Sequence, residues 1–194
     1  VLGCLKALGH PVAESIPALE HALGAPGRLE RVPDPRGVLV LVDYAHTPDA
    51  LRRAIASVRP LTSGKLSVVF GCGGDRDAEK RPKMGAAAAA ADHVFVTSDN
   101  PRTEDPSAII AQILPGLHAA GRKEHHIGSD AGYVVEPDRA AAISMALRLA
   151  SRGDTVLIAG KGHEDYPIVG TEQRDFDDRV CAAPVIAQIL ERAH

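Results

Sequence analysis

Short apolar runs recur along most of the chain, and each is followed by a polar loop and then by a stretch with helical spacing. The runs are continuous rather than alternating, which is typical of strands that are buried on both faces of a sheet. They lie at 38–42, 67–70, 94–97, 133–136 and 155–159. The helices that the spacing predicts lie at 48–59, 84–91, 106–117, 138–150 and 177–191. This alternation predicts an α/β fold with a mostly parallel sheet and helices on both faces.

The first 34 residues have a different pattern. Helical apolar spacing begins at once, Pro11 interrupts it, and a second short helix is expected over 16–23. A short strand is expected at 28–32, and the proline-rich stretch 33–37 is typical of a linker. We therefore predict two domains, 1–34 and 35–194. Because the chain starts abruptly and without Met, we expect it to be a piece of a longer protein.

Composition narrows the classes of function. The chain has 194 residues, of which 45% are hydrophobic, so the length suits one domain plus a fragment, or one large domain. Aromatic residues make up 3% and Trp is absent, which argues against a stacking platform for single-stranded nucleic acid. The net charge of −3 also argues against nucleic-acid or membrane-surface partners.

No membrane or secretion signal is evident in the sequence. No apolar run is long enough to span a bilayer, and no basic-then-apolar segment opens the chain. The three cysteines are far apart and odd in number, which indicates a reduced, cytoplasmic protein.

Four polar loops follow predicted strands, at the sheet edge where open parallel sheets bind ligands. In the first, Asp43 can hold a ribose hydroxyl or a metal-bound water, and His46 lies near a helix start. The alternative is that Asp43 caps the helix and His46 is a surface residue. The second loop, 71–77, has glycines that let a backbone approach an anion, but it lacks the spacing of a P-loop or a dinucleotide fingerprint. The alternative here is a solvated loop.

The third loop, Asp99-Asn100-Pro101-Arg102, combines opposite charges on a stiff backbone. Pro101 fixes its own φ and biases Asn100 towards an extended conformation. Arg102 offers a planar fork suited to a carboxylate, and Asp99 offers a negative charge. A ligand with both an ammonium and a carboxylate fits this pair, and the alternative is a solvated turn that begins the next helix.

The fourth loop follows the strand at 155–159. Gly160 and Gly162 permit close backbone approach, and Glu164 can accept an ammonium. Taken together, the loops resemble the carboxy-terminal domain of the Mur ligases. The motifs that carry the resemblance occur in the family's order across nearly the whole chain: Gly27-Arg28-Leu29-Glu30, Asp43-Tyr44-Ala45-His46-Thr47-Pro48, Gly71-Cys72-Gly73-Gly74-Asp75-Arg76-Asp77, Asp99-Asn100-Pro101-Arg102 and Gly160-Lys161-Gly162-His163-Glu164-Asp165-Tyr166.

The resemblance implies a three-domain ATP-dependent ligase of peptidoglycan synthesis. Its amino-terminal domain binds the UDP part, its central domain carries the ATP phosphate loop and the Mg²⁺ ligands, and a Rossmann-like carboxy-terminal domain brings the amino acid. The first domain and the phosphate loop have no counterpart here, and 1–34 is similar to the tail of the central domain. The resemblance therefore implies that this chain alone is inactive, and it assigns no catalytic residue or metal ligand to it.

The resemblance also implies roles for individual residues. Arg28 and Asp43, and His46 beside them, match positions near ATP. The Asp-Asn-Pro-Arg stretch is the signature of the members that add meso-diaminopimelate to UDP-N-acetylmuramoyl-L-alanyl-D-glutamate (UDP-MurNAc-dipeptide). The positions implied to bind meso-diaminopimelate are Arg76, Asp99, Asn100, Pro101, Arg102, Gly160 and Glu164.

One residue departs from the family's pattern, since Pro167 stands where Gln is expected after Asp-Tyr. Two alternatives of another class stay open at this point. One is a stand-alone Rossmann-like module that binds a nucleotide, and the other is a non-catalytic domain that binds a zwitterionic amino acid.

Overall fold

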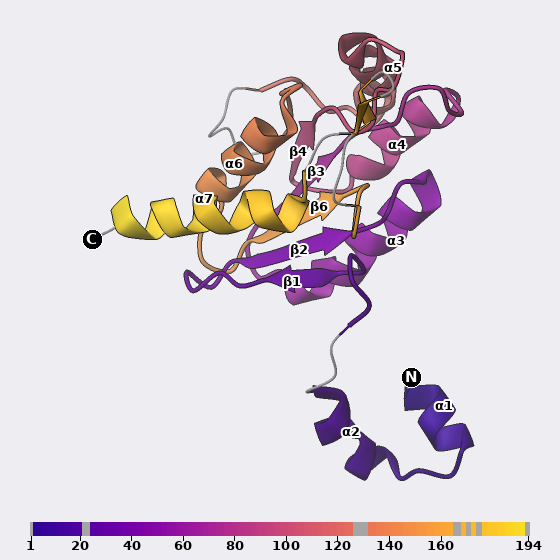
Figure 1. The fold of residues 1–194 in the computed structure, drawn as a ribbon, viewed down its shortest axis with the longest axis vertical. Coiled ribbons are helices and arrows are strands. Elements are labelled where there is room, and N and C mark those ends of the chain that lie inside the picture. Colours follow the sequence, from indigo (N-terminus) through magenta and orange to yellow (C-terminus); the bar gives the residue numbers. More distant parts are fainter. Residues whose placement is uncertain are drawn as a thin grey trace.

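A six-stranded sheet forms the centre of the chain (Figure 1). The computed structural model describes residues 2–20, 24–125, 132–164, 168–169, 172–173 and 176–192. Within them the strands follow the order β1-β2-β6-β3-β4-β5, with β1 antiparallel to β2 and the other neighbours parallel. The strands are β1 (Glu30–Val32), β2 (Leu39–Asp43), β3 (Leu66–Phe70), β4 (His93–Val96), β5 (Gly132–Val135) and β6 (Thr155–Ala159). A separate pair is formed by β7 (Ile168–Val169) and β8 (Glu172–Gln173).

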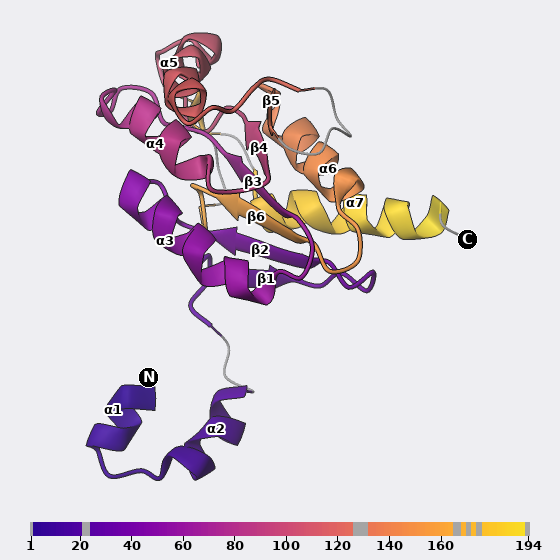
Figure 2. The ribbon, with the colours of Figure 1, turned by 180° about the vertical axis from the view of Figure 1, so that it is seen from behind.

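Helices cover both faces of the sheet (Figures 1 and 2). One face packs against α3 (Pro48–Val58), α4 (Lys80–Ala88) and α5 (Pro106–Ala119), and a short 3-10 turn, η1 (Arg59–Leu61), follows α3. The other face packs against α6 (Arg139–Leu149) and α7 (Asp178–Arg192). The predicted α/β fold with a mostly parallel sheet is therefore confirmed.

Each central strand is apolar throughout because alternate side chains enter two different cores. In β3, Val68 packs with the cluster under α3–α5, whereas Val69 packs with the cluster under α6 and α7. In β6, Leu157 packs with the cluster under α3–α5 and Ile158 packs with the cluster under α6 and α7. At about 25 cal/mol per Å² of buried apolar surface, burial on both faces lets each of these strands stabilise the fold from two sides.

The register of the parallel strands brings their carboxyl ends to one edge. Asp43 at the end of β2 pairs with Ala159 at the end of β6, and Phe70 of β3 pairs with Val96 of β4. The loops that follow β2, β3, β4 and β6 consequently emerge side by side. This edge carries the candidate site.

The start of α4 differs from the sequence prediction. The helix begins at Lys80 rather than at residue 84, because Arg81 lies inside the protein with 1% exposure instead of in a solvated loop. The alanine-rich run predicts close packing, and the structure shows it. A Cβ atom on Gly85 or Gly116 would overlap backbone atoms of the facing helix, so α4 and α5 touch through their backbones.

The first two helices, α1 (Leu2–Ala7) and α2 (Val12–Glu20), contact each other and lie apart from the sheet in both views (Figures 1 and 2). Leu8 is 75% exposed and Ile16 is 44% exposed. β1 lies on the amino-terminal side of residue 34 and yet pairs with β2. The division of the chain at residue 34 stays a prediction. Among the described residues, no helix is long and apolar enough to cross a membrane.

Candidate functional site

A cavity of about 390 Å³ opens at the edge where the four loops meet. All four loops contribute polar side chains to its lining. The lining residues are Tyr44, His46, Thr47, Gly73, Arg76, Asp77, Lys80, Asp99, Asn100, Arg102, Gly160 and Glu164. A site of this size and polarity suits a small ligand with charges of both signs.

One side of the cavity, which we call the acidic wall, consists of Asp99, Asn100 and Glu164. Asn100 is 7% exposed, and its Nδ2 donates to Glu164 Oε2 at 3.1 Å. The Tyr44 hydroxyl donates to Glu164 Oε1 at 3.3 Å. Both oxygens of Glu164 are therefore oriented by neighbours. Burial and then the Glu164 charge raise the pKa of Tyr44, which keeps its phenol protonated as the donor.

A buried lysine stands behind the acidic wall. Lys161 is 1% exposed, and its Nζ donates to Asn100 Oδ1 at 2.7 Å and lies 3.2 Å from Asp99 Oδ1. Gly160 has a φ of +118°, and a Cβ atom there would come within 3.0 Å of Asp99 Oδ2. The glycine thus lets the Asp99 carboxylate lie against the backbone at the end of β6.

A second group of lining residues, which we call the basic wall, consists of Arg76 and Arg102. Arg102 Nη1 donates to the carbonyls of Gly74 at 2.8 Å and Asn100 at 3.4 Å. Arg102 has a φ of +52°, an uncommon conformation for a residue with a Cβ atom. Arg76 is exposed, and its Nη1 donates to the carbonyl of Asp75 at 3.5 Å.

The two loops that carry these arginines are fastened to each other. Asp75 accepts hydrogen bonds from the backbone and hydroxyl of Thr103, and its own N–H donates to Glu104 at 2.6 Å. Arg81 pairs with Glu104 at 2.7 Å and donates to the carbonyl of Gly73. The hydrogen bonds from Arg81 and then from the Asp75 backbone lower the pKa of Glu104 to about 2. The loop that carries Arg76 is therefore braced against the loop that carries Arg102.

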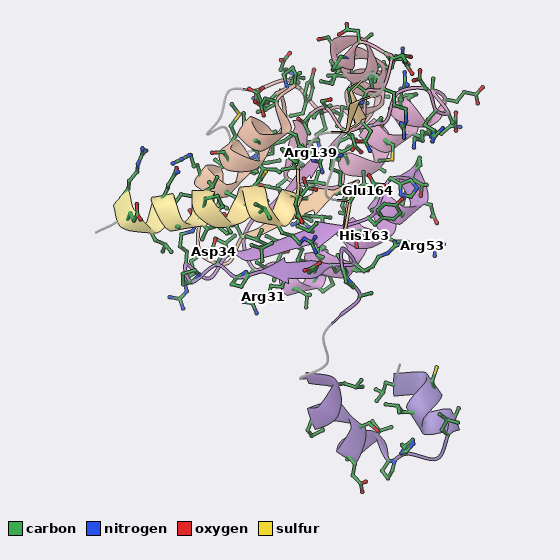
Figure 3. The ribbon with its side chains drawn as sticks, viewed as in Figure 1. Arg31, Asp34, Arg53, Arg139, His163 and Glu164 are labelled. Carbon is green, nitrogen blue, oxygen red and sulfur yellow. The ribbon has the colours of Figure 1, made fainter. Side chains whose placement is uncertain are left out.

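Next to the acidic wall lies a cluster centred on Tyr44. The guanidinium of Arg28 lies 4.9 Å from the centroid of the Tyr44 ring, and the ring of His46 meets it edge-on at 4.6 Å. His163, labelled with Glu164 in Figure 3, lies 5.4 Å from the same ring. Asp43 is 8% exposed, and its Oδ2 accepts the N–H of Leu29 at 2.8 Å. Asp43 does not cap α3, because Thr47 occupies that position.

Residues 27–162 match the family model described as "Mur ligase, glutamate ligase domain". The chain belongs to the Mur ligase family. It is 51% identical over 193 residues to the UDP-N-acetylmuramoyl-L-alanyl-D-glutamate--2,6-diaminopimelate ligase of Parasynechococcus marenigrum, covering 96% of this chain and 37% of that protein. The protein of the same name from Geobacter metallireducens is 50% identical over 181 residues, covering 90% of this chain and 35% of that protein.

Solved structures of Mur ligases share the fold. A structure of UDP-N-acetylmuramoyl-L-alanyl-D-glutamate--2,6-diaminopimelate ligase matches with a TM-score of 0.77 and 38% identity, over 97% of this chain and 37% of that one. The Thermotoga maritima MurF ligase in complex with ADP matches with a TM-score of 0.57 and 19% identity, over all of this chain and 37% of that one. This Mur ligase chain thus spans just over a third of the length of these relatives.

The structure brings most of the expected substrate residues to one cavity. Those that line it are Arg76, Asp99, Asn100, Arg102, Gly160, Glu164 and the nucleotide candidate His46. Pro101 does not line the cavity, and its carbonyl packs so closely on Gly74 that a Cβ atom there would overlap it. Arg28 and Asp43 lie outside the lining as well, and Arg28 joins the cavity only through Tyr44.

Several residues of the site were not expected from the sequence of this Mur ligase domain. Tyr44, Thr47 and Lys80 line the cavity, and Lys161 stands behind it. Three of these belong to the motifs that carry the family resemblance, but nothing local indicates that they face the cavity. Cys72 is packed inside the protein, and burial raises the pKa of its thiol to about 12. Asp165, Tyr166 and Pro167 lie outside the described residues.

Proposed function

We propose that this chain is the amino-acid-binding part of an ATP-dependent Mur ligase that adds meso-diaminopimelate to UDP-MurNAc-dipeptide. The observation that carries the proposal is that one cavity is lined both by two carboxylates, Asp99 and Glu164, and by two guanidiniums, Arg76 and Arg102. Such a cavity complements a ligand that has an ammonium at one place and a carboxylate at another. The sequence similarity to diaminopimelate ligases supports the same substrate.

The arginines give the cavity a means to select its amino acid. Diaminopimelate differs from lysine by one additional carboxylate. The guanidiniums of Arg102 and Arg76 can accept that carboxylate in charge-assisted hydrogen bonds. Lysine would leave those donors without the partner, which costs about 1–3 kcal/mol. The basic wall is therefore proposed to set specificity, and the acidic wall to hold the amino group.

The proposed reaction runs through an acyl phosphate. A carboxylate oxygen of the UDP-MurNAc-dipeptide attacks the γ-phosphorus of ATP, and ADP leaves. The amine of diaminopimelate then attacks the acyl carbon, the C–N bond forms, and the C–O bond to phosphate breaks. This chain's residues contribute by holding the amine in place, a positioning effect that can supply several kcal/mol.

Arg28, Asp43 and His46 are proposed to lie against the nucleotide. Asp43 Oδ2 accepts the N–H of Leu29, and its other oxygen is proposed to accept a ribose hydroxyl. Mg²⁺ offsets the charge of the transferring phosphoryl group in such reactions. Among the described residues no group of three or more His, Cys, Asp or Glu side chains could hold a metal ion, so we assign no step to Mg²⁺ in this chain. With Cys4, Cys72 and Cys181 free, the reducing cytoplasm is the proposed compartment.

The proposal is tested on the full-length ligase that contains this chain. Formation of ADP and of the UDP-MurNAc-tripeptide is measured with meso-diaminopimelate and with L-lysine as the amino acid. We expect kcat/KM for meso-diaminopimelate to exceed that for lysine by about 10- to 100-fold, the ratio that a difference of about 1–3 kcal/mol implies. Equal use of the two, or an upstream sequence without a phosphate loop, would contradict the proposal.

A further inference from the structure

We propose that Lys161 is a positioning residue for the amino-acid substrate. Its buried ammonium sets the orientation of Asn100 and the charge balance around Asp99, and through Asn100 it orients Glu164. The inference rests on the proposed function of the cavity. The evidence is the position of Lys161, which is 1% exposed and contacts two members of the acidic wall, Asn100 and Asp99. Lys161 itself does not line the cavity.

The first step in the argument is the burial of a charge. An ammonium removed from water is strongly destabilised unless charged or polar partners surround it. Lys161 follows β6 immediately after Gly160, and its side chain runs inward to Asn100 Oδ1 at 2.7 Å and Asp99 Oδ1 at 3.2 Å. An apolar side chain could fill the same space without the desolvation cost of an ammonium. The presence of a charged lysine at this position therefore indicates a function beyond packing.

The second step is the direction of the Asn100 amide. A lysine ammonium can only donate, so the amide must turn its oxygen towards Lys161. The Nδ2 group then has to face Glu164, whose Oε2 it reaches at 3.1 Å. A carboxylate can only accept, so Glu164 favours the same orientation of the amide from the other side. Lys161 therefore holds the Asn100 oxygen from the buried side and keeps Nδ2 directed at Glu164.

The third step is charge. Asp99 and Glu164 both line the cavity, and the Asp99 side chain is only 9% exposed. Two carboxylates that share a site repel each other. The ammonium of Lys161 offsets one of the two charges, which leaves a single negative charge on the wall. That balance matches one ammonium of a bound amino acid.

The kinetic test uses Lys161→Met in the full-length ligase, with Lys123→Met as the matched control because Lys123 is exposed. We expect KM for meso-diaminopimelate to rise about 10- to 100-fold, with a smaller change in kcat and an unchanged KM for ATP. Lys123→Met should leave all three unchanged. If KM for ATP rises as much as KM for meso-diaminopimelate, or if KM for meso-diaminopimelate does not change, the inference is overturned.

A second measurement needs neither a variant nor a substrate. In NMR spectra of this chain, the ammonium protons of Lys161 should exchange slowly and show contacts to the Asn100 side chain, whereas those of Lys123 should exchange too fast to be seen. Fast exchange at Lys161 would overturn the positioning role even if the ligase uses meso-diaminopimelate. Slow exchange in a ligase that does not use this amino acid would leave the arrangement intact and refute only the proposed function.

Discussion

The two walls of the cavity are built in opposite ways. On the acidic wall, side chains hold side chains, as Tyr44 and Asn100 each engage one oxygen of Glu164. On the basic wall, Arg102 is held through one nitrogen by backbone carbonyls, and no hydrogen bond to another described residue is made by its Nε or Nη2. Arg76 is exposed.

This difference indicates that the two walls have different roles in binding. A preorganised wall suits a group that every amino-acid substrate presents in the same place, since little has to be ordered on binding. A wall with unused donors suits the group that distinguishes one substrate from another, because those donors are satisfied only by the right ligand. The predictions below disturb each wall, or its support, in turn.

The largest effect is expected behind the acidic wall. Arg139, labelled in Figure 3, pairs with the fully buried Asp178 at 2.8 Å and donates through Nη2 to the carbonyl of Ala159 at the end of β6. Asp178→Asn leaves a buried cation uncompensated and should lower the free energy of unfolding by about 3–5 kcal/mol. Urea denaturation measures this. Asp49→Asn is the control, because the Asp49 carboxylate is 64% exposed. Equal decreases in the free energy of unfolding for the two variants would show that the Arg139–Asp178 pair does not support the fold.

The next largest effect is expected on the basic wall. Arg102→Ala removes the donors proposed to take the distal carboxylate, and kcat/KM for meso-diaminopimelate should fall by about 100-fold in the full-length ligase. KM for ATP should change little. Arg53→Ala is the matched control, because Arg53 is 79% exposed on α3. Steady-state kinetics with each substrate varied decide the matter, and a parallel loss for ATP would count against the role of Arg102.

A smaller effect should appear only in acid, at the brace behind the basic wall. The pKa of Glu104 is about 2 in the folded chain because Arg81 and the Asp75 backbone donate to its carboxylate. An unfolded Glu titrates near 4.3, so this carboxylate stabilises the fold above that pH. The contribution is lost as the pH falls from about 4.5 towards 2.

Thermal melts of the wild type and of Glu104→Gln test this dependence. The melting temperature of the variant should lie below that of the wild type at pH 7, and the gap should narrow as the pH falls through that window. Glu191→Gln, at an exposed glutamate of α7, should show no such change of gap. A gap that stays constant with pH would refute the brace.

The smallest effect is expected at Arg76. Because this arginine is exposed and makes one long contact, water competes for its donors. Arg76→Gln should raise KM for meso-diaminopimelate by only about three- to tenfold. The same kinetic assay on Arg76→Gln and Arg102→Ala ranks the two arginines. A larger effect of Arg76→Gln on the use of meso-diaminopimelate would show that Arg76, and not Arg102, is the main contact for the carboxylate.

The sequence predicts the sheet better than it predicts the supports of the site. Continuous apolar runs such as 155–159 mark strands buried on both faces, and the charged residues that follow them mark the edge where ligands bind. Arg102 and Glu164 could be found in this way. The family resemblance supplied the grouping of these loops into one cavity.

Contacts between distant residues could not be predicted in this way. Tyr44 and Glu164 are 120 positions apart, and only the pairing of β2 with β6 brings their loops together. Lys161 and Arg81 occur in charged stretches of the sequence, where a solvated side chain is the ordinary expectation, yet each is 1% exposed. Their burial depends on partners supplied by other elements, and no local pattern encodes it.

The central claim is that the basic wall selects an amino acid with a second carboxylate. Isothermal titration of this chain with meso-diaminopimelate and with L-lysine tests it most directly. The account predicts that meso-diaminopimelate binds about tenfold or more tightly than lysine, and that Arg102→Ala removes the difference. Equal dissociation constants for the two ligands, or a preference that survives Arg102→Ala, would contradict it.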